Sequence, residues 1–215
     1  MSVLADNWDL FRTGFWTTIK LFLLAGVLSM ALGTVLAAFR VSPVPALRAV
    51  GTCYVNSMRS TPLMLVFAFL VFGVPKMGVD LPSYFWAAVA ALTLYTASFI
   101  CEVVRSGINT VPPGQAEAAR SVGMTFFQLL ALVVLPQAFR VLMAPMTSVY
   151  VALLRNTTLA AGFSVVEAGS IPAAMAERGE NQLITLFWIA VGFLILIAPL
   201  VLLQRWAERR AGVLA

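Results

Sequence analysis

The chain has 215 residues, of which 61% are hydrophobic and only 11% charged, and its formal net charge is +5. A soluble globular domain carries about 25% charged residues, so a chain this apolar cannot cover itself with polar surface and has lipid as its solvent. The basic excess is explained by cytoplasmic loops of a membrane protein, and no nucleic acid partner is expected. The absence of histidine excludes His-based catalysis and most types of zinc site.

Five apolar stretches each supply the roughly 20 residues that a membrane-spanning helix needs. They predict spans at 15–39, 50–74, 84–106, 138–163 and 183–205. Turn-forming Pro and Gly residues separate these stretches. The polar segment before the first stretch has no basic region and no short apolar core, so that stretch is expected to stay in the membrane as an anchor rather than be removed as a signal peptide. The chain is therefore expected to be one all-α integral membrane domain over residues 1–215, with a long polar loop at 112–135.

The distribution of basic residues predicts the orientation. If the N-terminus lies outside, the loops after the first and third spans and the C-terminal tail lie inside. These inside segments hold Arg40, Arg48, Arg105, Arg120, Arg140, Arg205, Arg209 and Arg210. The outside segments hold only Arg12, Lys76 and Arg178. Because Lys and Arg concentrate on the cytoplasmic side, we expect the N-terminus outside and the C-terminus inside.

The two cysteines, Cys53 and Cys101, lie in or beside apolar stretches. Free cysteine is among the most frequently buried residue types. Both are therefore expected to be buried, reduced thiols.

The polar loop contains the sequence Gly-Gln-Ala-Glu-Ala-Ala-Arg-Ser-Val-Gly at 114–123. Its good helix formers, entered through Pro-Pro-Gly, predict a short helix that starts near Gln115. Glu117 would lie in the first turn, where the helix dipole favours a negative charge, and Gly123 could end the helix in a left-handed conformation. From spacing alone, an ordinary interfacial helix between two spans explains the loop equally well.

The same loop resembles the EAA loop of ABC importer permeases, in which Glu-Ala-Ala is followed at fixed spacing by Gly and then by an aliphatic residue and Leu-Pro. The matching positions are Glu117, Ala118, Ala119, Gly123, Val133, Leu135 and Pro136. Other segments resemble the histidine-, glutamine- and glutamate-type permeases of this family. These segments are Trp16–Leu21, Met58–Leu63, Glu102–Gly107, Pro136–Arg140 and Leu154–Leu159. Residues 40–44 and 105–111 resemble the glutamate-uptake permeases of actinobacteria in particular.

The resemblance implies a MetI-like permease core in the cytoplasmic membrane of a bacterium. It implies two ATPase subunits, a second permease subunit that is identical or related, and an extracellular solute-binding protein. The coupling residues it implies are Gly114, Gln115, Glu117, Ala118, Ala119 and Gly123. The chain contains no Gly-x-x-x-x-Gly-Lys-Ser/Thr phosphate loop, so ATP and Mg²⁺ are expected on a separate ATPase chain. No cofactor, metal or catalytic residue is expected in this chain.

Two polar groups interrupt the predicted spans, and we expect both to line a substrate pathway. A charge at the bilayer centre costs at least about 2.5–3.5 kcal/mol, so such groups need a partner, a wet cavity or an interface. The two groups are Arg59, Thr61 and Pro62 in the second span, and Arg155, Asn156, Thr157 and Thr158 in the fourth. For Arg59, anchoring in the headgroup region at a helix start is an equal alternative.

Arg155 could bind a substrate carboxylate or pair structurally with Glu102 or Glu167, and the sequence does not separate these roles. The spacing of Glu102 and Arg105 permits a local ion pair. Many permeases of this family have Asp where this chain has Asn156. A neutral amide removes the attraction for a cationic side chain, so the sequence predicts glutamate or glutamine as substrate.

Two other classes of function fit the sequence less well. A secondary transporter driven by an ion gradient commonly has paired inverted halves, and five spans do not divide in that way. An intramembrane enzyme would need a nucleophile and an acid or base in the membrane, and Lys20 and Lys76 are the only lysines. The favoured prediction is a permease subunit without chemistry of its own.

Overall fold

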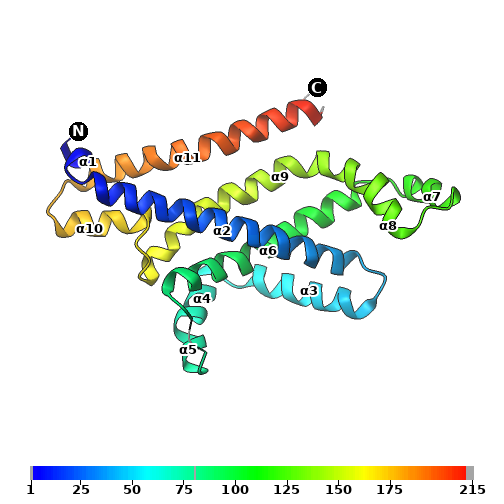
Figure 1. Cartoon of the computed structure of the whole chain (residues 1–215), viewed down its shortest axis with the longest axis horizontal. Helices are drawn as coiled ribbons and strands as arrows, with labels where there is room; N and C mark the ends of the chain where they lie inside the picture. The colour runs from blue at the N-terminus through cyan, green and yellow to red at the C-terminus, as the bar shows by residue number, and fades with distance from the viewer. Residues whose placement is uncertain (1, 80, 212–215) are drawn as a thin grey trace.

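The computed structural model describes residues 2–79 and 81–211, and all regular elements in that part of the chain are helical. The all-α prediction is confirmed. The two longest elements near the centre are α2 (Trp8–Val41) and α6 (Tyr84–Asn109), which pack along each other and form the spine of the molecule (Figure 1). A short α1 (Ser2–Asp6) precedes α2, and α3 (Pro45–Ser60) packs beside both central helices.

The α2–α6 crossing is close because small residues lie in it. Gly33 of α2 faces Ala97 and Ile100 of α6, and a Cβ atom on Gly33 would lie 2.7 Å from Ile100 Cβ. Val55 of α3 packs in the same cluster. The apolar side chains of Val55, Ala97 and Ile100 are all fully buried. The crossing brings the end of α2 that carries Arg40 next to the C-terminal half of α6.

The second predicted span is not one helix. It consists of α3 and of a segment at 63–76 that comprises α4 (Leu63–Ala68), a π-helical turn (Phe69–Gly73) and α5 (Val74–Lys76). The two parts meet at an angle of 104°. Pro62 has no backbone N–H to continue α3; the Thr61 hydroxyl instead donates to the carbonyl of Ser57, and the Pro62 carbonyl accepts from Leu65 N–H. The stretch predicted as a span at 50–74 thus forms two helical parts and not one straight helix.

The fourth predicted span also bends. A π-helical segment (Leu130–Val134) leads into α9 (Leu135–Asn156), which continues as a 3-10 helix (Thr157–Phe163). The parts on either side of residues 139–140 differ in direction by 62°. The helix thus begins before residue 138, inside the region predicted as loop, and the polar loop itself contains α7 (Pro113–Ser121) and α8 (Phe126–Leu129).

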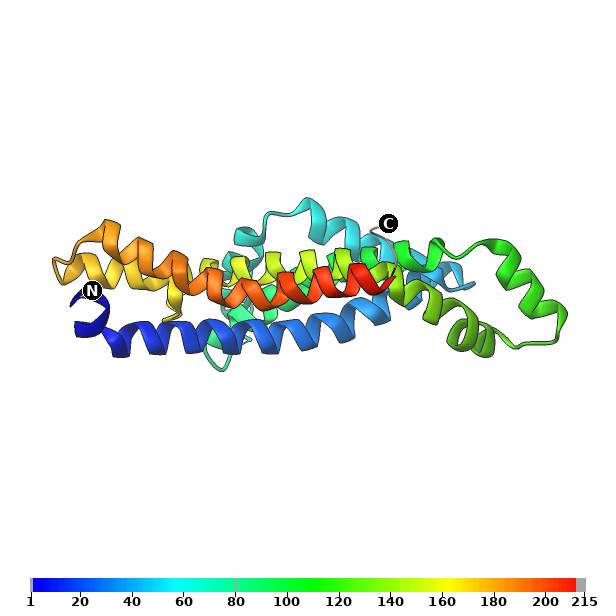
Figure 2. The ribbon, with the colours of Figure 1, turned by 90° about the horizontal axis from the view of Figure 1, so that it is seen from above.

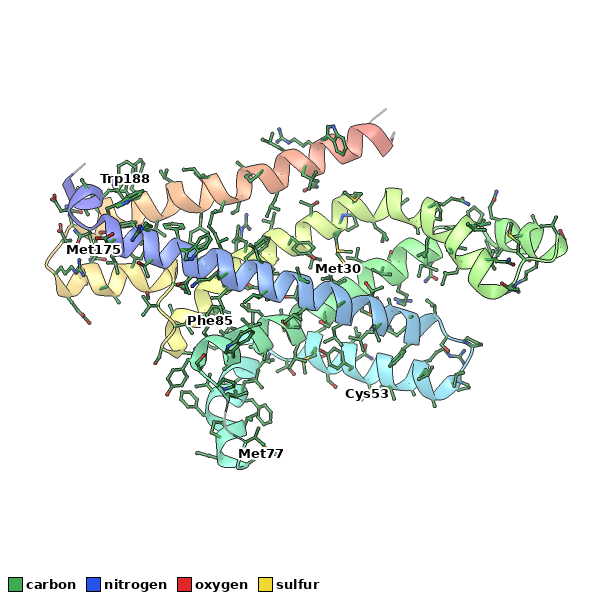
Figure 3. All side chains as sticks on the ribbon, in the orientation of Figure 1. Met30, Cys53, Met77, Phe85, Met175 and Trp188 are labelled. Atoms are coloured by element: carbon green, nitrogen blue, oxygen red, sulfur yellow. The ribbon has the colours of Figure 1, made fainter. Side chains whose placement is uncertain are left out.

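The remaining helices begin at the end of the molecule where the N-terminus lies, and α11 runs back from that end (Figure 1). A 3-10 turn (Ala168–Ser170), α10 (Ile171–Glu177) and α11 (Gln182–Ala211) complete the described chain. Met175 and Trp188, labelled in Figure 3, belong to the apolar cluster where α1, α2, α10 and α11 meet. Figure 2 shows that α10 and the N-terminus lie at one end of the long axis and α7 and α8 at the other.

Three helices in the described residues are long and apolar enough to cross a membrane, namely α2, α6 and Gln182–Trp206 of α11, and the number rises to five if each bent pair is one span. Where these helices enter and leave the bilayer stays a prediction. Cys101 is buried as expected, whereas Cys53 lies exposed on α3 (Figure 3), so the expectation for Cys53 is wrong.

Candidate functional site

A pocket with a volume of about 310 Å³ lies between α6 and α9. Its wall combines aromatic, aliphatic and polar side chains, and it is lined by Tyr95, Thr96, Phe99, Ser148, Val149, Ala152, Leu153 and Asn156. The residues from α9 follow each other at intervals of about four, which places them on one helix face. A largely apolar cavity of this size with a few polar groups has the character of a small-molecule site.

Asn156 is the only one of the seven predicted pathway residues that lines this pocket. Its side-chain amide offers two donors and one acceptor. The lining includes no carboxylate, so the wall formed by this chain holds no negative charge that would favour a cationic ligand.

Arg59 lies next to this pocket. Its guanidinium carbon lies 5.6 Å from the ring centre of Phe99, and Phe99 lines the pocket. The Arg59 side chain is 46% exposed. It lies at the C-terminal end of α3, just before the break at Pro62.

The carboxylate of Glu102 forms ion pairs with three arginines from three helices. Arg105 Nη2 of α6 lies 2.8 Å from Glu102 Oε2, which confirms the predicted local ion pair. Arg59 Nη1 lies 3.4 Å from Glu102 Oε1, and Arg40 of α2 donates to the same oxygen. The ionic group thus ties the ends of α2 and α3 to α6.

Arg155 takes neither of the structural partners that the sequence suggested. Glu102 binds the other arginines, and Glu167 is fully buried and accepts from the Thr18 hydroxyl at 2.9 Å. Arg155 is exposed at the end of α9. A structural pairing of Arg155 with Glu102 or Glu167 is therefore wrong for this structure.

Thr157 and Thr158 use their hydroxyls locally. Thr157 is fully buried and donates to the Leu154 carbonyl at 2.8 Å, and Thr158 donates to the Arg155 carbonyl at 2.8 Å. Thr157 therefore faces the protein interior and not an open pathway, because its side chain packs against its own chain. The Thr61 hydroxyl donates to the Ser57 carbonyl at the end of α3, and Pro62 is exposed at the bend.

Glu167 lies beyond the end of the fourth predicted span, in the turn before α10. Burial raises the pKa of Glu167, while hydrogen bonds from Gly169 N–H and the Thr18 hydroxyl act to lower it. Gly169 N–H donates to Oε1 at 2.7 Å. Glu167 thus anchors this turn to α2.

The predicted short helix is present as α7 (Pro113–Ser121), at the far end of the molecule from α10 (Figure 1). It begins two residues before Gln115, so Glu117 lies beyond the first turn and not in it as predicted. Gly114, Gln115, Glu117 and Ala118 are exposed, whereas Ala119 is buried against Leu129 and Val134. Gly123 has a φ of +82°, which confirms the predicted left-handed position after the helix. α7 therefore presents Glu117 outward and uses Ala119 to pack on its own chain.

Most of the pocket lies outside the predicted pathway residues. Thr96, Phe99 and Ser148 are not among them, although Ser148, Ala152 and Asn156 recur every four residues. That spacing was a usable signal for one face of α9. The role of Arg40 as a partner of Glu102 had no local signal, because 62 positions separate the two residues.

A family model described as "binding-protein-dependent transport system inner membrane component" matches residues 29–213. The chain is 42% identical to the glutamate transport system permease protein GluC of Corynebacterium efficiens, over 92% of each chain. It is 33% identical to the probable glutamine ABC transporter permease protein GlnM of Bacillus subtilis, over 98% of this chain and 97% of the relative.

Solved structures have the same fold. The crystal structure of an amino acid ABC transporter with histidines aligns with a TM-score of 0.88 at 25% identity, over 96% of each chain. The MetNI methionine ABC transporter in an inward-facing conformation aligns with a TM-score of 0.77 at 23% identity, over 98% of each chain.

Proposed function

The chain belongs to the family of binding-protein-dependent transport system inner membrane components and is a permease subunit of an amino acid ABC importer, and on this premise we propose that it carries glutamate or glutamine past the pocket between α6 and α9. Separate ATPase subunits supply the energy through α7. The exposed position of Glu117 on a short helix at one end of the molecule is the observation that carries this proposal.

The coupling role follows from the physical character of α7. A short helix that packs through Ala119 on α8 and on the π-helical segment leading into α9 can transmit a push to α9. Its outer face carries Glu117 as a charge for register and Ala118 as a small side chain that permits close approach. We propose that two ATPase subunits, which bind ATP and Mg²⁺, receive this face and its copy in a second permease subunit.

The choice of substrate rests on the charge of the pocket and on the relatives. Asn156 lines the pocket as a neutral amide, and no carboxylate lies in its wall. Arg59 lies beside this pocket and is partly exposed, and Arg155 is exposed one position before Asn156. This arrangement favours a ligand with at least one free carboxylate, and it matches the glutamate and glutamine named for the two relatives.

The assembly and orientation complete the proposal. The basic residues around α7 and at the end of α11 support a cytoplasmic location for these segments in a bacterial cell, because Lys and Arg concentrate on that side. The N-terminus and α10 then lie outside, where a solute-binding protein delivers the amino acid. A second permease, identical or related, provides the other wall of the pathway.

The test uses the transporter reconstituted in liposomes with its ATPase subunits and binding protein. In Glu117→Lys we expect normal insertion, because an exposed substitution changes stability by no more than about 0.5 kcal/mol, together with loss of ATPase co-purification and of ATP-driven uptake. Glu177→Lys is the matched control, since Glu177 is an exposed glutamate on α10 at the opposite end, and it should retain ATPase binding. Full uptake in Glu117→Lys, or uptake that needs an ion gradient and no ATPase, would overturn the proposal.

A further inference from the structure

The ionic group around Glu102 divides its bonds unequally between the two carboxylate oxygens. Oε2 accepts twice from Arg105, from Nη2 at 2.8 Å and from Nε at 3.2 Å. Oε1 serves both Arg40 and Arg59. The Arg59 contact, at 3.4 Å, is longer than the 2.7–2.9 Å of a strong charge-assisted hydrogen bond. Glu102 therefore contacts Arg59 through Nη1 only, and the other N–H groups of the Arg59 guanidinium do not contact Glu102.

The charges in this group do not balance. Three guanidinium groups face one carboxylate, so two positive charges are in surplus. The side chains of Arg40 and Arg105 are 11% and 36% exposed, whereas that of Arg59 is 46% exposed. The surplus charge is thus most accessible at Arg59.

The position of Arg59 directs this charge toward the pocket. Its guanidinium lies over Phe99, and that ring lines the space in which Asn156 also lies. A planar guanidinium that is fixed on one side presents its remaining N–H groups in a fork that matches a carboxylate.

We propose that Glu102 is a positioning residue that holds the Arg59 guanidinium beside the α6–α9 pocket, where it binds a carboxylate of the amino acid substrate. This inference rests on the proposed function, because it assigns the partner of the substrate's negative charge at the same site. Arg40 and Arg105 neutralise and orient Glu102 in turn. The substrate carboxylate then supplies one of the missing negative charges.

Two other roles for Glu102 give different results. If Glu102 only tied three helices together, its loss would lower stability or the maximum rate and leave the KM unchanged. If Glu102 only reduced the positive potential, its loss would strengthen the attraction for glutamate and lower the KM. If it positions Arg59, its loss raises the KM even though the net positive charge increases.

The experiment measures KM and maximum rate of ATP-driven glutamate uptake in proteoliposomes with equal amounts of transporter. For Glu102→Gln we expect the KM to rise roughly tenfold with less than a twofold change in maximum rate. Glu102→Asp, which keeps the charge, should recover part of the affinity. Asp9→Asn is the matched control, because it breaks an exposed Arg–carboxylate pair at i,i+3, Asp9 with Arg12, away from the pocket; its KM should equal that of wild type.

Arg59→Lys provides an independent arm if Glu102→Gln does not fold. It keeps the charge and removes the planar fork, so we expect the KM to rise by a similar factor. In the double variant the KM should rise no further than in either single variant, because residues that act through one interaction are not additive.

A KM for Glu102→Gln equal to or below that of wild type overturns the inference, as does full additivity in the double variant. Both results leave the proposed function standing, since wild type still imports glutamate. A wild-type transporter that imports neither glutamate nor glutamine refutes the proposed function instead.

Discussion

The crossing of α2 and α6 offers a direct test of the packing that holds Arg40 against Glu102. A Cβ atom on Gly33 would lie 2.7 Å from Ile100 Cβ and 2.9 Å from the Ala97 carbonyl oxygen. Carbon atoms in good contact are about 3.5–4.0 Å apart. In Gly33→Ala the two helices must therefore separate by roughly 1 Å, a gap that forfeits a quarter to a half of each affected contact.

The magnitude follows from two opposing terms. Overpacking a tight core costs about 1–3 kcal/mol, and the higher helix propensity of Ala returns up to about 1 kcal/mol. We expect a net loss of about 1–2 kcal/mol in the free energy of unfolding. At roughly 2–4 °C per kcal/mol for a chain of this size, the Tm should fall by about 2–8 °C.

The assay is thermal unfolding of the purified chain in detergent, followed by glutamate uptake of the reconstituted transporter. Gly162→Ala is the matched control, because nothing lies within 4 Å of its added Cβ, and it should leave the Tm unchanged or raise it by the equivalent of about 0.4–1 kcal/mol. Uptake should fall in Gly33→Ala, since a wider crossing weakens the Arg40–Glu102 contact. A Tm for Gly33→Ala at or above that of wild type would refute the close packing of these helices.

Two further predictions concern the charges near the site. Asn156→Asp places a carboxylate in the pocket wall and should shift the ratio of affinities from glutamate toward arginine by roughly tenfold, or 1.4 kcal/mol. The ratio is measured as displacement of labelled glutamate from the purified transporter, and an unchanged ratio would exclude Asn156 as a determinant of selectivity. Glu167→Gln should flatten the pH dependence of the Tm. Burial raises the pKa of Glu167, so the contribution of Glu167 to stability is present at low pH and is lost as the pH rises through that raised pKa. Gln carries no charge and therefore does not titrate. Thermal unfolding of both proteins between pH 5 and pH 8 measures the difference, and parallel curves would contradict it.

The sequence by itself determined the class of the protein and the elements that depend on neighbouring residues. Apolar runs of about 20 residues require lipid, because no polar surface could cover them. The short helix around Glu117 and the left-handed Gly123 follow from residues within ten positions of each other, and both are present. The Glu102–Arg105 pair lies within one helical turn and was predictable for the same reason.

Only the tertiary structure decided which polar groups meet. Glu102 binds Arg40 from 62 positions away, and Glu167 binds Thr18 from 149 positions away. Helical periodicity shows which residues share a face, but the rotation of one helix against another depends on close contacts such as that of Gly33 with Ile100.

The same distinction explains the pathway residues. Asn156 lines the pocket while the adjacent Thr157 faces the interior, because successive residues on a helix point about 100° apart and only packing selects the face that opens. Pro62 predicts an interruption of the second span, but the direction that the chain takes after its 104° bend is accompanied by contacts of α4 with α6 and with the 3-10 helix after α9, which the sequence did not predict. Residues close in sequence thus specify the local helices, whereas contacts between helices distant in sequence position the charged side chains near the pocket.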